Sequence, residues 1–558
     1  MHALDEEEPM YTYDPHPFRE WFERDFTYLA GFRRTVRRFG GRTAMIDPET
    51  GEQHTYAELA AQVDSLASGL VDAGVEPGDV VTYQLFNSPA FARLYLATQA
   101  AGAVGSPINF RLAAGEIAHV LDDSAPRVFV YDTELTGTVR DALALAAHRP
   151  ALVVATGAGD PLPGAVRIGE LSRDGAPPAP GRTTYDETTR LYTSGTTGMP
   201  KGVPLNSLVE VFSAHDVIMH FPLGPEDRTL NMTPWFHRGG LYAAGPNPAF
   251  YVGAGVVPLR AFDPYRCLDL VVELGLTYLI GAPTNLEMLA RAQADRPRDL
   301  STLRGIVTMG APLERGACLR YQELLTPRIF NGYGTTETFW NTFLRPEDLP
   351  AHAGSAGRAS TDDDVRVARI DDAGNTSPET VVARDSEEIG EVVVRSPKGG
   401  YAYTGGAEPE KFVDGWVRLG DLATWDADEF VTIVGRKDDM LVSGGENVHP
   451  VQVEEALNEH PGVADSLVVG VPDERWGRRV VAYVVPAVDG LTAAECDAHC
   501  RAHPMLADFK RPRGYRFVDS LPLTATGKKI HYKAAAQAAA DDAAGLFEIA
   551  GPSEGARP

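Results

Sequence analysis

Hydrophobic and polar residues follow two alternating periods along the first part of the chain. Residues 55–74 repeat apolar positions every three or four residues and close at a glycine, which predicts an amphipathic helix. The apolar run 80–86 predicts a strand, and residues 90–103 predict a second helix. Similar short apolar runs bounded by turn residues stand at 127–132, 151–156, 256–259, 278–283 and 305–310. This alternation predicts an α/β fold with parallel strands and crossover helices.

The pattern becomes more compact after about residue 435. Helices are predicted at 450–460 and 491–503, and strands at 465–471, 480–486 and 514–519. We therefore expect a large N-terminal domain of stacked mixed or parallel sheets (1–434), a small mobile α+β C-terminal domain (435–535) and an Ala/Gly-rich tail (536–558).

Two segments outside this core pattern are also distinctive. The Gly/Pro-rich stretch 158–186 predicts a surface loop. Residues 18–40 predict one amphipathic helix with arginines on its polar face, which we expect to pack on the large domain.

The charge balance narrows the classes of function. Lys and Arg number 51 against 77 Asp and Glu, giving a net charge of −26, so phosphate backbones would be repelled and nucleic acid is not an expected partner. The 44% hydrophobic and 23% charged content is typical of a globular enzyme. Four scattered cysteines, and the absence from the sequence of any apolar run of about 18 residues, predict a cytoplasmic protein without membrane insertion. A homodimer is a further expectation.

The segment 193–202, TSGTTGMPKG, has the composition of a phosphate-binding loop. Backbone amides of its glycines and threonines can surround a polyphosphate, the hydroxyls add donors, and Lys201 supplies a cation. A Walker A loop is excluded because Pro200 precedes the lysine and Gly202 follows it. A flexible Gly/Thr hairpin turn is the alternative interpretation.

A second polar loop, NGYGTTET at 331–338, follows an apolar stretch and so falls where ligand sites of open α/β sheets collect. Its Glu337 offers a carboxylate to a hard cation, and Mg²⁺ prefers one or two carboxylates together with phosphate oxygens. A capped turn with an exposed acid is the alternative.

Five motifs in order resemble those of the AMP-forming adenylating enzymes, the superfamily that contains acyl- and aryl-CoA synthetases. They are TSGTTGMPKG (193–202), NGYGTTET (331–338), GWVRLGD (415–421), GRKDDMLVSGGENVHP (435–450) and LPLTATGK (521–528). The motif texture is most similar to the aryl-CoA ligase branch. The resemblance implies ATP, Mg²⁺ and CoA as cofactors or co-substrates, and a small carboxylic acid as substrate.

The resemblance also implies roles for individual residues. Glu337 is implied as the Mg²⁺ ligand, Tyr333 as the residue that stacks on adenine, Thr336 as a phosphate contact, and Asp421 and Arg436 as ribose contacts. The full implied set for nucleotide and CoA is Thr193, Ser194, Gly195, Thr196, Thr197, Lys201, Gly310, Ala311, Pro312, Asn331, Gly332, Tyr333, Gly334, Thr335, Thr336, Asp421, Arg436, Gly444, Gly445 and Trp476.

Three further residues have roles implied by the family. Lys528 is implied as the catalytic lysine of adenylate formation because it directly follows Gly527, whereas the adjacent Lys529 does not. His237, in TPWFHRGG, is implied at the acyl pocket, as a bridge to the nucleotide or a gate of the thiol tunnel; a packed core histidine is the alternative. Asp438 is implied as the hinge about which the small domain turns between two catalytic poses.

The acceptor and the acid are less strongly indicated. The Gly-Gly pair of SGGEN (443–447) permits close approach of a slim pantetheine arm, and in the family this loop and the ERWG segment at Trp476 line the thiol tunnel. Cations at 478–479 and 510–511 suit either the CoA phosphates or solvent. The acyl pocket is implied to include aromatic walls, which favour a flat or unsaturated acid: Trp235, Phe236, Phe339 and Trp340.

Three hypotheses for function follow. The first is an ATP-dependent carboxylate–CoA ligase for an aromatic or related acid. The second is an adenylating enzyme whose intermediate passes to a carrier protein or to a nitrogen nucleophile. The third is a catalytically silent nucleotide sensor, which the joint presence of Lys201, Glu337, Asp421, Arg436 and Lys528 argues against.

Overall fold

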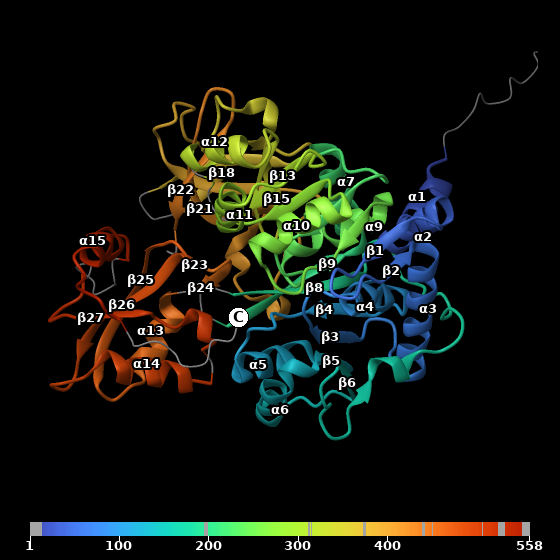
Figure 1. Cartoon of the computed structure of the whole chain (residues 1–558), viewed down its shortest axis with the longest axis horizontal. Helices are drawn as coiled ribbons and strands as arrows, with labels where there is room; N and C mark the ends of the chain where they lie inside the picture. The colour runs from blue at the N-terminus through green and yellow to red at the C-terminus, as the bar shows by residue number, and fades with distance from the viewer. Residues whose placement is uncertain are drawn as a thin grey trace, which may run out of the picture.

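Three sheets and their helices build a large body, and a smaller α+β unit lies against one end of it in the computed structural model (Figure 1). The structure describes residues 14–194, 199–310, 313, 315–371, 375–437, 441–448, 450–504, 506–522 and 531–549. Among these residues, none of the helices is long and apolar enough to cross a bilayer.

The first sheet has seven strands in the order β7-β6-β5-β3-β4-β8-β9, parallel except for the β8–β9 hairpin. Its strands are β3 (Val80–Gln84), β4 (Val104–Pro107), β5 (Val128–Asp132), β6 (Leu152–Thr156), β7 (Val166–Arg167), β8 (Glu187–Ser194) and β9 (Pro200–Asn206). The accompanying helices are α3 (Tyr56–Asp72), α4 (Pro89–Ala100), α5 (Ala114–Ser124) and α6 (Thr136–Leu145). Every residue of β3 and β5 is buried, as expected for parallel strands covered on both faces.

The second sheet has nine strands in the order β16-β15-β14-β13-β12-β10-β11-β1-β2, with a parallel centre and antiparallel edges. Its strands are β1 (Thr43–Ile46), β2 (Gln53–Thr55), β10 (Arg228–Asn231), β11 (Gly255–Val257), β12 (Tyr278–Gly281), β13 (Gly305–Met309), β14 (Ile329–Thr335), β15 (Phe339–Leu344) and β16 (Arg358–Ala359). Its helices are α7 (Ser207–His220), α8 (Arg238–Tyr242), α9 (Pro246–Val252), α10 (Pro264–Leu274), α11 (Pro283–Asp295) and α12 (Arg315–Leu324). One hydrophobic core joins the first two sheets.

The third sheet is antiparallel throughout and carries the GWVRLGD motif. It contains β17 (Asp364–Ile370), β18 (Thr376–Val381), β19 (Gly390–Arg395), β20 (Phe412–Val413), β21 (Trp416–Trp425) and β22 (Val431–Arg436). The β21–β22 register places Asp421 opposite Arg436, so two residues separated by a hairpin are neighbours.

The small unit has its own sheet and core. The hairpin β23 (Leu441–Ser443) and β24 (Glu446–Val448) precedes a four-stranded sheet of β25 (Val463–Asp473), β26 (Gly477–Pro486), β27 (Gly514–Phe517) and β28 (Glu548–Ile549). Its helices are α13 (Pro450–Asn458), α14 (Ala493–Ala502) and α15 (His531–Ala543). Because α15 packs on β25 and β28 pairs with β27, residues 536–549 belong to this unit, although the sequence predicted a tail from 536.

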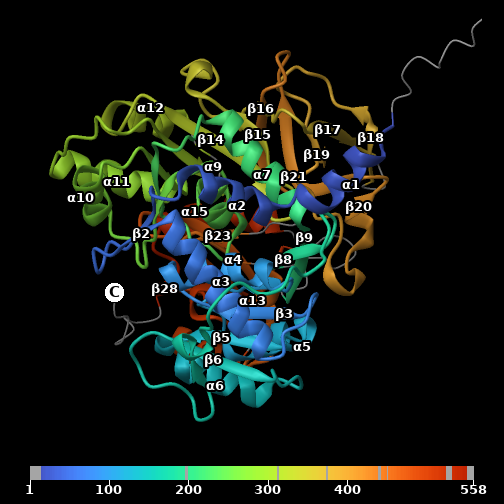
Figure 2. The same cartoon turned by 90° about the vertical axis from the view of Figure 1, so that its right-hand side faces the viewer.

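The N-terminal stretch forms two helices where the sequence predicted one. Helix α1 (His16–Asp25) ends before Thr27, and α2 (Tyr28–Phe39) begins there because the Thr27 side chain accepts a hydrogen bond from the amide of Ala30. Helix α2 buries Tyr28 and Phe32 against the large body, as expected, whereas α1 has no buried residue. Figure 2 shows α1 and α2 on the side of the large body that faces away from the small unit.

The mixed α/β class predicted from the sequence is confirmed. The long strands β25 and β26 and the capped helix α3 also fall where the hydrophobic pattern predicted them. Short additional strands and 3-10 turns, such as β7 within the predicted loop 158–186, have too few residues for any periodic signal.

Candidate active site

The β8–β9 hairpin positions the predicted phosphate-binding loop. Thr193 and Lys201 face each other in its antiparallel register. Gly195, Thr196 and Thr197 lie outside the described residues, and of Ser194 only the backbone is described. The Lys201 ammonium forms an ion pair with the carboxylate of Glu408.

The NGYGTTET loop and the GWVRLGD strand meet at one side chain contact. Tyr333 lies on β14, directly after four buried residues of that strand. Its hydroxyl donates a hydrogen bond to Asp421 Oδ2 at 2.6 Å. Asp421 is buried on β21 and is next to Arg436 in register. Residues from the second and third sheets therefore converge at this contact. Asn331 extends from the same strand and donates to the carbonyl of Ser355 at 3.3 Å.

Glu337 is a buried carboxylate held in the ionised form. The Lys411 ammonium lies 2.8 Å from Glu337 Oε1, and the Tyr403 hydroxyl donates to the same oxygen. Burial alone would raise the pKa of Glu337, but the charge of Lys411 and hydrogen bonds from Lys411, Tyr403 and Thr335 outweigh it and lower the pKa to about 2. The carboxylate is thus available as an anionic oxygen ligand at any physiological pH.

The loop carrying Thr335, Thr336 and Glu337 is anchored by a buried arginine. Arg238 begins α8 and donates through NH1 to the carbonyl of Thr336 at 2.6 Å and through NH2 to that of Lys398 at 2.7 Å. Burial lowers the pKa of its guanidinium to about 10, where it stays protonated. Arg238 therefore connects the loop after β14 to the segment around Lys398, which follows β19.

His237 lies where the small unit touches the large body. Its Nε2 is 3.2 Å from Oε2 of Glu446, the first residue of β24 after the Gly-Gly turn of SGGEN. Glu446 is buried and also accepts from Asn109 Nδ2 at 2.9 Å, and Arg111 NH1 lies 3.3 Å from its other oxygen. The predicted core alternative for His237 does not describe this position, because the ring reaches an interdomain carboxylate and is partly exposed.

The same turn brings two predicted tunnel residues together. Gly444 has φ of 59°, and a Cβ there would approach the indole ring of Trp476 to 2.7 Å, so only glycine fits without displacement. The Gly444 amide donates to the carbonyl of Trp476 at 2.8 Å, which fixes the turn against the ERWG segment. Gly445 is exposed at the tip of this turn.

Two cations proposed for CoA phosphates or for solvent are committed elsewhere. Lys510 is buried and ion-paired with Glu116 of α5, and it also donates to Gln452 at 2.9 Å. Arg511 is buried against Asp497. Neither of the two alternatives drawn from the sequence describes these residues: Lys510 joins the small unit to the large body, and Arg511 stabilises the small unit itself.

The four aromatic residues expected at the acyl pocket are all buried. Phe236 packs against the His237 ring in a tilted arrangement with centroids 4.3 Å apart, which places it near the site. Trp235 packs edge-to-face on Phe91 inside the main core, and the Trp340 indole donates to buried Asp216. Phe339 stacks on Trp340 and lies beneath the guanidinium of Arg238. Trp235 and Trp340 therefore have core packing partners of their own.

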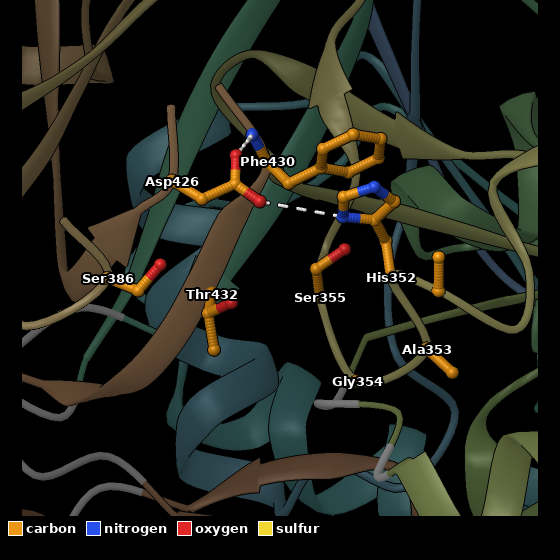
Figure 3. Close-up of a pocket in the computed structure, with 9 residues that line it drawn as sticks. His352, Ala353, Gly354, Ser355, Ser386, Asp426, Phe430 and Thr432 are labelled. Atoms are coloured by element: carbon orange, nitrogen blue, oxygen red, sulfur yellow. Dashed lines mark hydrogen bonds and ion pairs between the residues drawn. The ribbon is translucent and has the colours of Figure 1, made fainter. Parts of the chain in front are cut away.

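A cavity of about 330 Å³ lies at the far side of the β21–β22 hairpin and contains none of the predicted site residues (Figure 3). In its wall, His352 stacks on Phe430 with centroids 3.4 Å apart and faces Asp426 at 3.5 Å. The backbone carbonyl of Ser355, in the cavity wall, accepts the hydrogen bond from the Asn331 side chain. The cavity is therefore a hollow beside the site, lined by other residues.

Some predicted residues lie outside the described part of the chain: Ala311, Pro312, Asp438 and Lys528. Gly310 directly follows β13 and has a φ of 84°, and the side chain of Arg436 is not described. No cluster of three or more His, Cys, Asp or Glu side chains suited to a metal occurs among the residues described.

Family models for the AMP-binding enzyme and for the AMP-binding enzyme C-terminal domain match residues 32–403 and 452–528. The chain belongs to the AMP-binding enzyme family. It is 37% identical to a feruloyl-CoA synthase of Amycolatopsis sp over 482 residues, 86% of this chain and 92% of that protein. It is 34% identical to the fatty acid–[acyl-carrier-protein] ligase ScoC of Streptomyces coeruleorubidus, covering 86% and 90%. The structure of the amide bond synthetase McbA from Marinactinospora thermotolerans matches with a TM-score of 0.77 at 29% identity, covering 92% and 99%.

Several residues of this AMP-binding enzyme were not found from sequence. Glu446 lies inside the SGGEN motif, where the adjacent glycines drew the interpretation away from the carboxylate. Tyr403, Glu408 and Lys411 occupy a segment that carries none of the five motifs, so no sequence signal pointed to them. Arg238 directly follows His237, but a buried arginine gives no signal in the sequence that distinguishes it from an exposed one.

Proposed function

We propose that this protein is an ATP-dependent, AMP-forming acid–CoA ligase. An acid carboxylate attacks the α-phosphorus of ATP and releases pyrophosphate, and the CoA thiol then attacks the acyl-adenylate carbonyl and releases AMP. The observation that carries the proposal is the contact between Glu446 and His237, because it brings the Gly-Gly turn next to the residue that precedes Arg238, the anchor of the Glu337 loop. A protein that only adenylates has no need for this arrangement.

The nucleotide site is proposed from the residues that converge between the second and third sheets. Tyr333 stacks on adenine, Asp421 accepts hydrogen bonds from the ribose hydroxyls, and Lys201 binds the polyphosphate. Their support is the 2.6 Å contact between Tyr333 and Asp421 and the position of Lys201 at the end of its hairpin.

Replacing Tyr333 with Phe should weaken ATP binding by roughly tenfold, because hydrogen bonds to charged groups contribute about 1.5–3 kcal/mol. The ring remains for stacking, whereas Asp421 loses a donor that orients it. Calorimetric titration with ATP measures the dissociation constant. An unchanged constant would show that Tyr333 does not position Asp421 for the ribose.

We propose Glu337 as the protein ligand of Mg²⁺. The donor set fits, since a buried, ionised carboxylate is a hard oxygen ligand and ATP supplies the remaining oxygens. When bound, the ion would neutralise charge on the phosphate oxygens. Lys528 is proposed to stabilise the negative charge that develops at the α-phosphate, and Arg238 holds the loop of Glu337 in place.

The acid is proposed to be aromatic or closely related, such as an arylpropenoic acid. The support comes from the ring of Phe236 beside His237 and from the relative that is named a feruloyl-CoA synthase. A flat acyl group would contact such rings with little loss of conformational entropy.

Transfer to a carrier protein or to an amine is the second candidate function. It is favoured by relatives named as an acyl-carrier-protein ligase and as an amide bond synthetase. It is also favoured by the commitment of Lys510 and Arg511 to ion pairs, which removes two cations from a CoA phosphate site.

The proposed function is tested by AMP release from ATP with benzoate, cinnamate, ferulate, aminobenzoate and medium-chain acids, with and without CoA. We expect acid-dependent AMP release and a thioester detected by mass when CoA is present. Acid-dependent adenylate without thioester would instead support the second candidate, and amine or carrier acceptors would then yield the acylated product.

We further propose that the chain divides at 434/435 and that Asp438 is the hinge. This proposal is supported by the SGGEN segment lying at His237, and we assign this arrangement to thioester formation. Delivery of Lys528 for adenylation requires a second pose, and the short link between β22 and β23 is where the backbone would turn.

Replacing Glu446 with Gln should slow thioester formation by about tenfold or more. The buried carboxylate contacts Asn109, Arg111 and His237, and the substitution removes its negative charge from all three contacts. Acyl transfer from a synthetic acyl-adenylate to CoA measures this step. Acid-dependent exchange of pyrophosphate into ATP, which reports adenylation, should stay within twofold. Glu474→Gln is the matched control. It removes an exposed carboxylate of the small unit that forms an ion pair with Arg291 of the large body. Equal losses in both half-reactions would contradict a role confined to the second.

A further inference from the structure

The segment 403–411, here called the strap, contacts two charged residues of the proposed ATP site, Lys201 and Glu337. It contains the 3-10 turns η4 (Thr404–Gly406) and η5 (Pro409–Lys411) and packs against β9. Its Thr404 hydroxyl accepts a hydrogen bond from the Gly202 amide at 3.2 Å, next to Lys201. The strap is therefore anchored beside the lysine of the phosphate-binding loop.

Two ion pairs connect the strap to the site. Glu408 pairs with Lys201, and Lys411 lies 2.8 Å from Glu337. The four side chains are 4–20% exposed, so these charges are largely removed from bulk water and their pairing is stronger than at an open surface.

Tyr403 joins the two pairs into one cluster. Its hydroxyl donates to Glu337 and accepts from Lys411 at 2.7 Å. The ammonium groups of Lys201 and Lys411 lie 5.7 and 5.3 Å from the centre of its ring, within range of a cation–π interaction. The proposed phosphate cation and the proposed metal ligand are thus neighbours across a single ring.

The strap charges have the same signs as the proposed ligands. On Lys201, the carboxylate of Glu408 occupies a position suited to a phosphate oxygen; on Glu337, the ammonium of Lys411 occupies a position suited to a divalent cation. Glu408 is also held at φ of 46° and ψ of 54°, a left-handed conformation that is unfavourable for a residue with a Cβ. Such conformations concentrate where a segment changes state.

We propose that the strap is an internal stand-in for Mg-ATP, which keeps Lys201 and Glu337 paired until the nucleotide exchanges with Glu408 and Lys411. This inference rests on the proposed ATP site. The exchange makes nucleotide binding a replacement of one set of ion pairs by another, so the strap weakens ATP binding by the free energy needed to break its own pairs. The opposite model is a fixed support, in which Glu408 and Lys411 stay in place and help to bind ATP.

The test compares Glu408→Gln with Glu410→Gln, which removes the same charge from an exposed position two residues away. ATP binding is measured by calorimetry in EDTA, without acid or turnover. We expect Glu408→Gln to tighten ATP binding about threefold to tenfold relative to Glu410→Gln, the range that a partly buried ion pair supplies. AMP, which lacks the polyphosphate, should bind both variants and the wild type within twofold. Unchanged or weaker ATP binding in Glu408→Gln would overturn the proposal in favour of the fixed support.

A second comparison addresses the cation side of the exchange. ATP affinity is measured across a Mg²⁺ titration, and the half-saturating Mg²⁺ concentration is compared between variants. In Lys411→Gln this concentration should fall about threefold to tenfold, because no ammonium competes with Mg²⁺ for Glu337. Lys533→Gln, an exposed position on α15, is the matched control. A higher Mg²⁺ requirement in Lys411→Gln would overturn the exchange. Failure of the wild type to bind ATP at all would instead overturn the proposed function, so the two failures are distinguishable.

Discussion

Replacing Lys528 with Ala should reduce adenylate formation by about 100- to 1,000-fold, the range seen when a preorganised group that stabilises developing negative charge is removed. The expectation rests on the TATGK sequence and on the need for a cation at the α-phosphate as pyrophosphate leaves. The side chain would act only in the adenylation pose. Transfer of acyl groups from a synthetic acyl-adenylate to CoA should therefore continue at close to the wild-type rate.

Lys529→Ala is the matched control, since it removes the same charge from the adjacent position. Acid-dependent pyrophosphate exchange measures adenylation in both variants, and the transfer assay measures the second step. If Lys529→Ala lost adenylation and Lys528→Ala retained it, the catalytic position would be one residue further along the chain. If both steps failed together in Lys528→Ala, the assignment of two poses would be wrong.

The fold was predictable because its signals are local. Helix α3 begins at Thr55 with a complete capping box to Glu58, and its apolar residues recur at helical spacing. Strand β3 is a continuous apolar run with turns at both ends. By contrast, the break between α1 and α2 depends on one threonine side chain, and β28 depends on a long-range pairing to β27 that no local pattern encodes.

The candidate site divides in the same way. Tyr333, Glu337 and Asp421 were found because they stand inside motifs with fixed spacing. The charges that neutralise them were not, because ion pairs such as Lys411 with Glu337 join residues far apart in the sequence. Lys510 illustrates the converse error: a lysine beside an arginine suggests an exposed cationic patch, but here it is buried against Glu116 of another domain.

Replacing Glu337 with Gln should lower kcat/KM for adenylation by about 100-fold or more, since a metal ion contributes several kcal/mol of charge stabilisation in such sites. Gln keeps the shape and loses the anionic oxygen, so the half-saturating Mg²⁺ concentration should also rise. Pyrophosphate exchange across a Mg²⁺ titration measures both. Wild-type kcat/KM in Glu337→Gln would exclude Glu337 as the metal ligand.

The same variant has a distinct pH signature in stability. The pKa of Glu337 is about 2, below the ordinary value of 4.5, so the ionised carboxylate stabilises the fold above about pH 4.5, and this contribution is lost as the pH falls toward 2. The difference in unfolding free energy between the wild type and Glu337→Gln should therefore be constant from pH 5 to 8 and shrink in acid. Denaturant unfolding at several pH values measures it. A difference that instead grew in acid would mean that Lys411 and Tyr403 do not hold Glu337 ionised, and the metal-ligand assignment would lose its electrostatic basis.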